Sequence, residues 1–398
     1  MTLRLAVVVS HPIQHFAPWH REVARIPGVE LKVFFCCDWG VVGYFDPQFQ
    51  IEVAWDIPLL DGYDHEFLPI RKRPERLGFW EVDNPDVGRA LASFRPDVVQ
   101  VFGYARRTNW RAVRWARRAR VPVMMFSDSN LAAPRSMARR AAKYAVVRWF
   151  YSYIDGALYV GENNRRYHMH YGLPDDRLFR GVLPIDRERL VASVADFAEA
   201  RQRVRRKHGI PDDAFVVLFC GKLTANKRPI DVLHASAALQ REGLPVWALV
   251  VGEGSERAAI EACAQSEGIH RLTMTGFVNQ SSIGEYYAAS DVLALSSEFE
   301  SFGLVVSEAA SFGVPAVVTE SVGCVGEDDA ARPGVNALTY PCGDVDALTD
   351  ALRRLCTEAS VYERMSANAV EVSRTQDVVV LAQSLAAGAV RLKELGPR

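Results

Sequence analysis

The stretch DVLALSSEFESFGLVVSEAASFGVP, residues 291–315, decides the fold class of this chain. Its first five residues form a short apolar run that predicts a buried parallel strand, and the small and acidic residues 296–301 predict a loop. Gly303 then opens a segment with helical apolar spacing, carried by Leu304, Val305, Ala309 and Phe312. A strand, a loop and a helix in this order are typical of a parallel α/β sheet.

The start of the predicted helix is suited to an anion. The N–H groups of a first helical turn have no partner within the helix and favour a phosphate at the mouth of the loop. We expect this role for Ser301, Phe302, Gly303, Leu304 and Val305. Glu300 and Glu308 flank that position, a spacing that also fits a solvated helix face. The apolar neighbours of Glu308 would make an unpaired carboxylate costly to bury, so a ligand hydroxyl is its expected partner.

Length and composition describe an ordinary globular chain of two domains. A chain of 398 residues is too long for one ordinary core, and a formal net charge of -1 gives no sign of a nucleic-acid partner. The apolar run at the N-terminus, about seven residues, is too short for a signal peptide or a membrane span, so we expect a cytoplasmic protein. Seven cysteines without a C-x2-C pair predict reduced thiols, not disulfides or a zinc site.

The first half alternates strands and helices. Strands are predicted at residues 3–9, 30–35, 96–101 and 121–126, with helices at about 84–94 and 110–118, as in a doubly wound parallel sheet. Ligands of such sheets bind beyond the carboxyl ends of the strands, which points to the loops at residues 10–16 and 127–130. The polar candidates on these loops are His11, Gln14, His15 and Asp128. Capping or turn roles are the alternative.

The chain is strongly basic between residues 101 and 150, where Asp128 is the one acid. Aromatic residues accompany the cations, a composition typical of a surface that lies against anionic lipid, and a solvated charged face is the alternative. The basic residues are Arg106, Arg107, Arg111, Arg114, Arg117, Arg118, Arg120, Arg135, Arg139, Arg140, Lys143 and Arg148.

The second half begins again with a strand at residues 215–220, after a linker near residues 183–189 and a charged helical segment. Gly221 follows the strand, and the spacing of Lys222 and Lys227 around a small-residue turn allows both to reach a diphosphate. Solvated loop lysines are the alternative, and the spacing excludes a P-loop. Further strands are predicted at residues 246–251, 272–275 and 314–319, with glycine-containing turns at Gly252, Gly254 and Gly276, and helices at about 345–372 and 377–395.

These motifs together resemble the donor domain of the retaining glycosyltransferases of family 4, which have the GT-B fold of two Rossmann-like domains facing each other across a cleft. The resemblance is strong over residues 215–350 and fainter before them. The resemblance also includes the tetrapeptide Gly-Val-Asn-Ala at residues 334–337. It implies that Lys222 and Lys227 hold the diphosphate of a nucleotide sugar, and that Gly276, Phe277 and Val278 meet the base. Glu308 would then bind the ribose and Glu300 the transferred sugar.

The same resemblance implies a hexosyltransferase that moves a sugar from a UDP- or GDP-sugar to a hydroxyl of a glycan, lipid-linked or small-molecule acceptor, with retention and without a metal or other cofactor. The first domain, residues 1–189 with a helix at about 375–398, would bind the acceptor, and residues 190–374 the donor. His11, His15 or Asp128 would deprotonate or orient the acceptor. Cell-surface polysaccharide biosynthesis, at the inner face of the membrane if the basic patch binds lipid, is the expected setting.

Two alternatives remain open at this stage. A nucleotide-sugar epimerase or hydrolase on the same fold would turn over its substrate without an acceptor. A sugar-nucleotide binding protein at a membrane would show no turnover. The chain also departs from the family pattern, since Lys222 stands where arginine is common and the loop at residues 10–15 lacks the usual glycine pair.

Overall fold

The computed structural model of the chain describes residues 2–132 and 136–398, so Arg135 of the predicted basic patch lies outside the described residues. The chain divides into two compact units. The first runs to Tyr44, continues over Pro58–Pro184 and ends with Asp377–Arg398, and the second comprises Phe45–Ile57 and Ile185–Gln376. The segment Phe45–Ile57 therefore belongs to the second unit, although the sequence prediction assigned it to the first domain.

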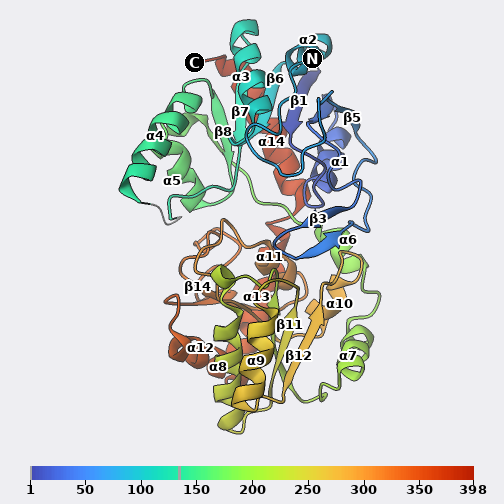
Figure 1. Ribbon diagram of the computed structural model, residues 1–398, viewed down its shortest axis with the longest axis vertical. Helices are drawn as coiled ribbons and strands as arrows, with labels where there is room; N and C mark the ends of the chain where they lie inside the picture. Colours follow the sequence, from blue (N-terminus) through green and yellow to red (C-terminus); the bar gives the residue numbers. More distant parts are fainter. Residues whose placement is uncertain (1, 133–135) are drawn as a thin grey trace. The chain divides into compact units, whose positions relative to one another are not determined.

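The first unit is built on a parallel sheet in the order β5-β2-β1-β6-β7-β8-β9 (Figure 1). Its central strands consist almost entirely of apolar residues, as expected for strands covered on both faces. The strands are β1 (Leu3–Val9), β2 (Val29–Phe35), β5 (Asp64–Phe67), β6 (Val98–Phe102), β7 (Val123–Phe126), β8 (Gly156–Tyr159) and β9 (Leu178–Arg180).

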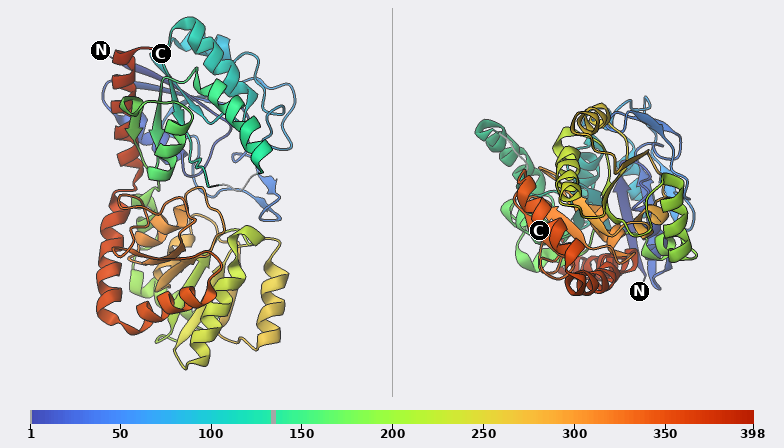
Figure 2. Two further views of the ribbon diagram at one scale, coloured as in Figure 1. Left: turned by 90° about the vertical axis from the view of Figure 1, so that its left-hand side faces the viewer. Right: turned by 90° about the horizontal axis from the view of Figure 1, so that it is seen from below.

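Helices pack on this sheet through alternate residues of the strands. Ala6, Val99 and Met125 of neighbouring strands share a buried cluster with residues of α2 (Val87–Phe94), α3 (Arg107–Ala119), α4 (Met137–Tyr151) and α5 (Glu162–His170). The helix α14 (Val378–Leu395) packs against α1 (Ala17–Arg25) and against β8 and β9, and Figure 2 shows it in red along the first unit. The end of the chain thus completes the unit formed by its beginning.

The second unit has a parallel sheet in the order β12-β11-β10-β13-β14-β15. Its strands are β10 (Phe215–Cys220), β11 (Val246–Val251), β12 (Leu272–Gly276), β13 (Val292–Leu295), β14 (Ala316–Thr319) and β15 (Ala337–Tyr340). Both units confirm the predicted class of two doubly wound parallel sheets.

The helices of the second unit explain the charged segment after the linker and the long helical pattern near the end. The charged segment after the linker forms α6 (Arg187–Ala192) and α7 (Phe197–His208). The long helical pattern near the end forms two helices, α12 (Val345–Thr357) and α13 (Ala359–Arg374). The others are α8 (Pro229–Arg241), α9 (Arg257–Glu267), α10 (Ile283–Ala288) and α11 (Leu304–Ala310). Short 3-10 turns occur at Asp175–Arg177 and Ala225–Lys227.

A two-stranded ribbon of β3 (Tyr44–Asp46) and β4 (Ile51–Val53) supplies the part of the second unit that comes from early in the sequence. The segment Phe45–Ile57, which we call the ribbon segment, holds most of it. Over the part of the chain that the structure describes, every helix falls short of the length and apolar character that a membrane crossing requires.

Candidate active site

The loops that follow β10 and β13 meet at the carboxyl edge of the second sheet. The Ser296 hydroxyl donates 2.8 Å hydrogen bonds to the carbonyl oxygens of Lys227 and Arg228. In the same two loops, the N–H of Glu298 donates a 2.8 Å hydrogen bond to the carbonyl oxygen of Asn226. These bonds fix the relative position of the two loops, which carry the lysines and the first glutamate of the predicted site.

Lys227 and Glu300 form an ion pair at this junction, with each side chain about four-fifths buried. The Ser297 hydroxyl lies 3.4 Å from the same oxygen of Glu300. Burial lowers the pKa of Lys227 to about 8, and the nearby charge of Lys222 acts in the same direction. The lysine is therefore protonated at neutral pH and titrates within the range in which an enzyme can be assayed.

Glu308 is buried on α11, and the Tyr287 hydroxyl donates a hydrogen bond of 2.6 Å to its Oε2. Burial raises the pKa of Tyr287 well above its ordinary value, so the hydroxyl stays a donor. The expectation that a ligand hydroxyl is the partner of Glu308 was thus incomplete, because the protein supplies one partner itself. Within the described residues this bond leaves Oε1 for a ligand.

Lys222 contacts the ribbon segment. Its Nζ lies 3.0 Å from Oδ2 of Asp46 and 2.8 Å from Oε1 of Gln48, and it sits 4.8 Å from the centroid of the Phe49 ring. Asp46 also accepts hydrogen bonds from the N–H groups of Gln48 and Phe49, which closes the turn of the ribbon. Burial would raise the pKa of Asp46, but these bonds and Lys222 hold it below its ordinary value.

The ribbon segment also covers the loop after β12, where the sequence predicts the base site. The Phe277 ring packs edge-on against Phe49 at 5.2 Å between centroids, and Trp55 lies 6.3 Å from it. The Asn279 side chain donates to the carbonyl oxygen of Ala54 at 2.8 Å. Val278, between these contacts, is half-buried. The Phe277 ring, packed against Phe49, therefore lies on the loop where the resemblance predicts contact with the nucleobase.

The four predicted glycines have different surroundings. A Cβ on Gly252 would lie 1.8 Å from the carbonyl oxygen of Gly221, so glycine at this position permits the loops after β10 and β11 to touch. Gly254 is likewise packed against Leu223. A Cβ on Gly221 would meet no atom within 4 Å, which leaves room for a ligand on that side. Gly276 ends β12 beside the carboxylate of Glu253.

The helix α11 begins directly after Gly303, whose φ of +108° suits glycine. Ahead of it, Phe302 is buried, and its carbonyl oxygen accepts a 3.0 Å hydrogen bond from the N–H of Cys324. Ser301 precedes Phe302 and is half-buried, as are Leu304 and Val305 in the first turn. The backbone of residues 301–305 is therefore held by packing against the loop after β14.

The tetrapeptide at residues 334–337 has a role in folding. Asn336 is buried, its side-chain amide donates to the carbonyl oxygen of Ala330 at 2.8 Å, and its Oδ1 accepts from the N–H of Arg332 at 2.9 Å. The N–H of Gly334 donates to the carbonyl oxygen of Ala337. These bonds form the turn that leads into β15.

The predicted polar residues of the first unit lie at the carboxyl ends of β1 and β7. The hydroxyl of Ser10 lies 2.9 Å from Nδ1 of His11, and Nε2 of His15 lies 3.2 Å from Nε2 of Gln14. Burial, with a contribution from Arg106, lowers the pKa of His11 to about 4, so His11 is neutral at pH 7. Burial raises the pKa of Asp128.

The basic stretch is less uniform than its sequence indicates. Asp83, which lies outside that stretch, pairs with Arg107 at 3.1 Å and with Arg111 at 2.5 Å. Arg106 is partly buried near Cys36 and Cys37, and this burial lowers its pKa. The exposed remainder lies on α3 and α4 and comprises Arg114, Arg117, Arg118, Arg120, Arg139, Arg140 and Arg148, with Lys143 half-buried.

Comparison with known families agrees with this arrangement. The family described as Glycosyl transferases group 1 matches residues 200–372, and the Glycosyl transferase 4-like domain matches residues 46–180. Each match covers less than half of the chain, and together they make it similar to these two groups of glycosyltransferases. The first match covers the strands and loops that carry Lys222, Lys227 and both glutamates, which is where the resemblance was strongest.

Individual relatives of this chain are distant. It is 26% identical over 203 residues to the alpha-D-kanosaminyltransferase of Streptomyces kanamyceticus, which covers 49% of this chain and 52% of that protein. It is 28% identical to the GDP-mannose-dependent alpha-mannosyltransferase of Mycobacterium tuberculosis, covering 75% and 76%. The chain thus spans about half the length of the first of these relatives.

Solved structures share the fold of this chain. The crystal structure of Anabaena HepE in complex with UDP and glucose superposes with a TM-score of 0.70 at 16% identity, over 97% of this chain and 98% of that one. The likeness supports the GT-B class for two Rossmann-like units.

Several residues of the site were missed by sequence reasoning. Asp46, Gln48 and Phe49 lie about 175 residues before Lys222, as the separation of 176 between Asp46 and Lys222 indicates, and no local pattern links them. Tyr287 lies on α10, the helix before β13. Nothing in the sequence indicates that its hydroxyl contacts Glu308.

Proposed function

We propose that this family 4 glycosyltransferase transfers a sugar from a UDP- or GDP-sugar to an acceptor hydroxyl, with retention of the anomeric configuration and without a metal ion. The observation that carries the proposal is the meeting of two lysines and two glutamates at the carboxyl edge of one parallel sheet. Lys227 contacts Glu300 there, while Glu308 keeps one carboxylate oxygen for a ligand. Ligands of such sheets bind at this edge.

The charges suit departure of a nucleoside diphosphate. Breaking the anomeric bond places negative charge on the diphosphate and positive charge on the sugar ring. Lys222 and Lys227 stabilise the former, and each preorganised donor contributes on the order of 2 to 4 kcal/mol to lowering the barrier. Glu300 stabilises the ring. Its contact with Lys227 holds both charged groups in position before the donor arrives.

Metal independence rests on the residue types at the site. Lys222 and Lys227 supply the positive charge that a divalent cation supplies to a departing phosphate in other enzymes. Among the described residues, the one group of three possible metal ligands is His234, Cys263 and Glu267 on α8 and α9, and it contains none of the predicted donor residues.

The acceptor belongs to the first unit in this proposal. His11 is neutral at physiological pH and can accept a proton, and Asp128 lies at the end of the strand two positions across the sheet. Either group orients or deprotonates the attacking hydroxyl, with His15 on the same loop as His11.

We also propose that one face of α4 rests on an anionic membrane. Arg139, Val146 and Trp149 recur at helical spacing on this helix and are exposed, Trp149 by 58%. An exposed tryptophan beside arginines is typical of helices that lie in the headgroup region.

The decisive experiment incubates the purified protein with a panel of UDP- and GDP-sugars, with and without acceptors, and measures free nucleotide. NMR of the product gives the anomeric configuration, and an arm with EDTA tests metal independence. Nucleotide release that needs an acceptor and survives EDTA is expected. Release without an acceptor would indicate an epimerase or hydrolase, and binding without turnover would indicate a sugar-nucleotide binding protein.

A further inference from the structure

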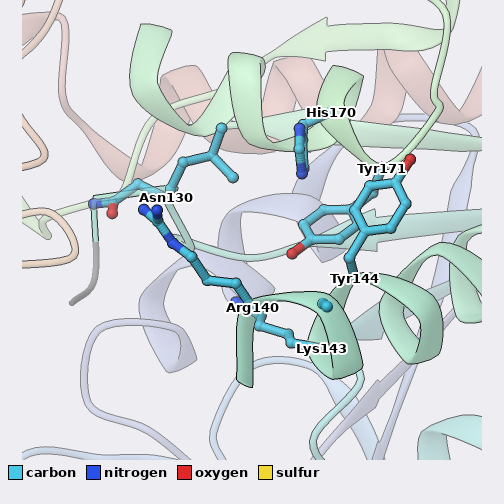
Figure 3. Close-up of a pocket in the computed structure, with 8 residues that line it drawn as sticks. Asn130, Arg140, Lys143, Tyr144, His170 and Tyr171 are labelled. Carbon is cyan, nitrogen blue, oxygen red and sulfur yellow. The ribbon is translucent and has the colours of Figure 1, made fainter. Parts of the chain in front are cut away.

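A cavity of about 530 Å³ opens in the first unit. The residues that line it have so far been described only as part of the basic stretch or not at all. Figure 3 shows the side chains around it. A volume of this size is within the range of small-molecule sites. The lining residues that matter are Asn130, Arg140, Lys143, Tyr144, His170 and Tyr171.

Three elements form the walls of the cavity. Asn130 belongs to the loop after β7, Arg140, Lys143 and Tyr144 come from α4, and His170 ends α5. The loop is held to α5 because the side-chain amide of Asn164 donates a 2.7 Å hydrogen bond to the carbonyl oxygen of Ser129. The cavity is therefore a built feature of the unit.

The aromatic wall is well packed. The Tyr144 and Tyr171 rings lie 5.8 Å apart, and His170 contacts them at 5.1 and 4.9 Å between centroids. In Figure 3, the Arg140 side chain extends from α4 toward Asn130, while the two tyrosines and His170 stand on the other side. A ligand in this cavity would have a ring or apolar face on one side and a cation on the other.

The charge of the lining is of one sign. Arg140 and Lys143 are cationic, and the described residues of the lining include no aspartate or glutamate. The Nζ of Lys143 lies 5.1 Å from the ring centroid of Tyr167 and 5.9 Å from that of Tyr104, so its ammonium group rests over aromatic rings behind the lining. Arginine forms bidentate hydrogen bonds with phosphate, and lysine adds a point charge.

We propose that this cavity binds a phosphate group carried by the acceptor, next to a ring or apolar part of the same molecule. The inference rests on the proposed glycosyl transfer. Asn130 follows Asp128 by two residues, so a phosphate held by Arg140 and Lys143 lies at the loop that carries a predicted acceptor residue. The acceptor is thus assigned to soluble phosphorylated molecules that carry a ring or an apolar part.

The test uses phenyl phosphate, which combines a phosphate with a ring, and phenyl β-glucoside, which lacks the charge. Binding to the full chain is followed by ligand-observed NMR in wild type, in Arg140→Ala, in Lys143→Ala and in Tyr144→Ala. Arg139→Ala is the matched control, because Arg139 is an exposed arginine of the same helix outside the lining. Circular dichroism and thermal melting verify that each variant is folded.

We expect phenyl phosphate to bind and phenyl β-glucoside not to bind. Arg140→Ala and Lys143→Ala should each weaken phenyl phosphate roughly ten-fold or more, as for loss of a charge-assisted bond, while Arg139→Ala stays close to wild type. Equal affinity in Arg140→Ala and Arg139→Ala would overturn the inference, and so would equal binding of the neutral glucoside.

A second arm separates the sources of the phosphate. Vesicles of phosphatidic acid and vesicles of phosphatidylcholine are compared with soluble phenyl phosphate on the same variants. Binding of phosphatidic acid without any binding of phenyl phosphate would assign these cations to a lipid surface and overturn the cavity site. UDP affinity, measured in parallel, should be unchanged by Arg140→Ala. If phenyl phosphate binds as expected but no nucleotide sugar is turned over, the proposed function fails while the anion site stands.

Discussion

The Tyr287 hydroxyl donates to Oε2 of Glu308, so one oxygen of this buried carboxylate is occupied by the protein. The tyrosine, which lies on α10, restrains the orientation of the carboxylate on α11. In the proposed function the other oxygen, Oε1, accepts from the ribose of the donor. The contribution of Tyr287 to donor binding can be measured separately from the contribution of the Glu308 carboxylate.

Replacing Glu308 with glutamine should raise the KM for the donor and leave kcat largely unchanged, because the contact is made equally in ground and transition states. The loss corresponds to roughly 1 to 3 kcal/mol for a charge-assisted bond. Tyr287→Phe should raise KM less, by about 0.5 to 1.5 kcal/mol for one neutral bond. Initial-rate kinetics with a nucleotide sugar checks both. A fall in kcat at unchanged KM in either variant would show that the carboxylate acts on the sugar.

Glu300 should behave in the opposite way. Glu300→Gln removes the charge that faces the developing positive ring, so kcat should fall by roughly 10² to 10³ while UDP affinity changes little. Ser297→Ala, which removes a weaker neighbour of the same oxygen, is the milder control. Isothermal titration with UDP beside steady-state kinetics separates the two effects. Loss of UDP binding with kcat retained would reverse the roles of the two glutamates.

The low pKa of Lys227 predicts a pH dependence. The ammonium form binds the diphosphate, so activity should be full below pH 8 and should fall as the pH rises through about 8 in the free protein. The quantity to measure is kcat/KM for the donor, which reports the free enzyme. Lys227→Arg should move this fall to higher pH, because a guanidinium stays protonated. Lys227→Ala should lower kcat by roughly 10² to 10³. A profile of Lys227→Arg identical to wild type would assign the fall to another group.

The contact between Lys222 and Asp46 competes with a diphosphate for the same ammonium. Asp46→Asn keeps an oxygen that accepts the N–H groups of Gln48 and Phe49, yet removes the charge. UDP should then bind roughly two- to five-fold more tightly, in the range of a partly exposed ion pair. Asp56→Asn, in the same segment but in contact with Ser281, is the matched control. Weaker UDP binding in Asp46→Asn would mean that the aspartate positions Lys222 for the ligand.

The membrane proposal is tested on the face of α4 that lies outside the cavity lining. Wild type should sediment with vesicles that contain phosphatidylglycerol at low salt and be released as salt rises, because surface charge is screened. Trp149→Ala and Arg139→Ala should both weaken this binding. Lys393→Ala, on α14, serves as a charge-matched control. Equal sedimentation with neutral vesicles would contradict an electrostatic attachment.

The sequence predicted best those elements whose own residues determine them. The strands β1, β10 and β11 match the predicted apolar runs residue for residue, because a strand covered on both faces is apolar throughout. The short strands β8, β9 and β15 were missed, since three or four residues carry too little periodicity. The lysines and glutamates at the edge of the second sheet were predicted from their motifs, and their roles stay predictions. Asp46 was missed because its contact with Lys222 is formed only in the folded chain.

The composition of the second unit has a consequence for how the protein can be divided. The chain passes between the units after residues 44, 57, 184 and 376, and the ribbon segment that contacts Lys222 and Phe277 is encoded far upstream of both. A clone of residues 185–376 would express a second unit whose Lys222 and Phe277 lack their neighbours. Chimeras that exchange the second unit between relatives therefore need to transplant two separate pieces of gene, and variation in the short upstream piece changes the surroundings of Lys222 and Phe277 without any change in residues 185–376.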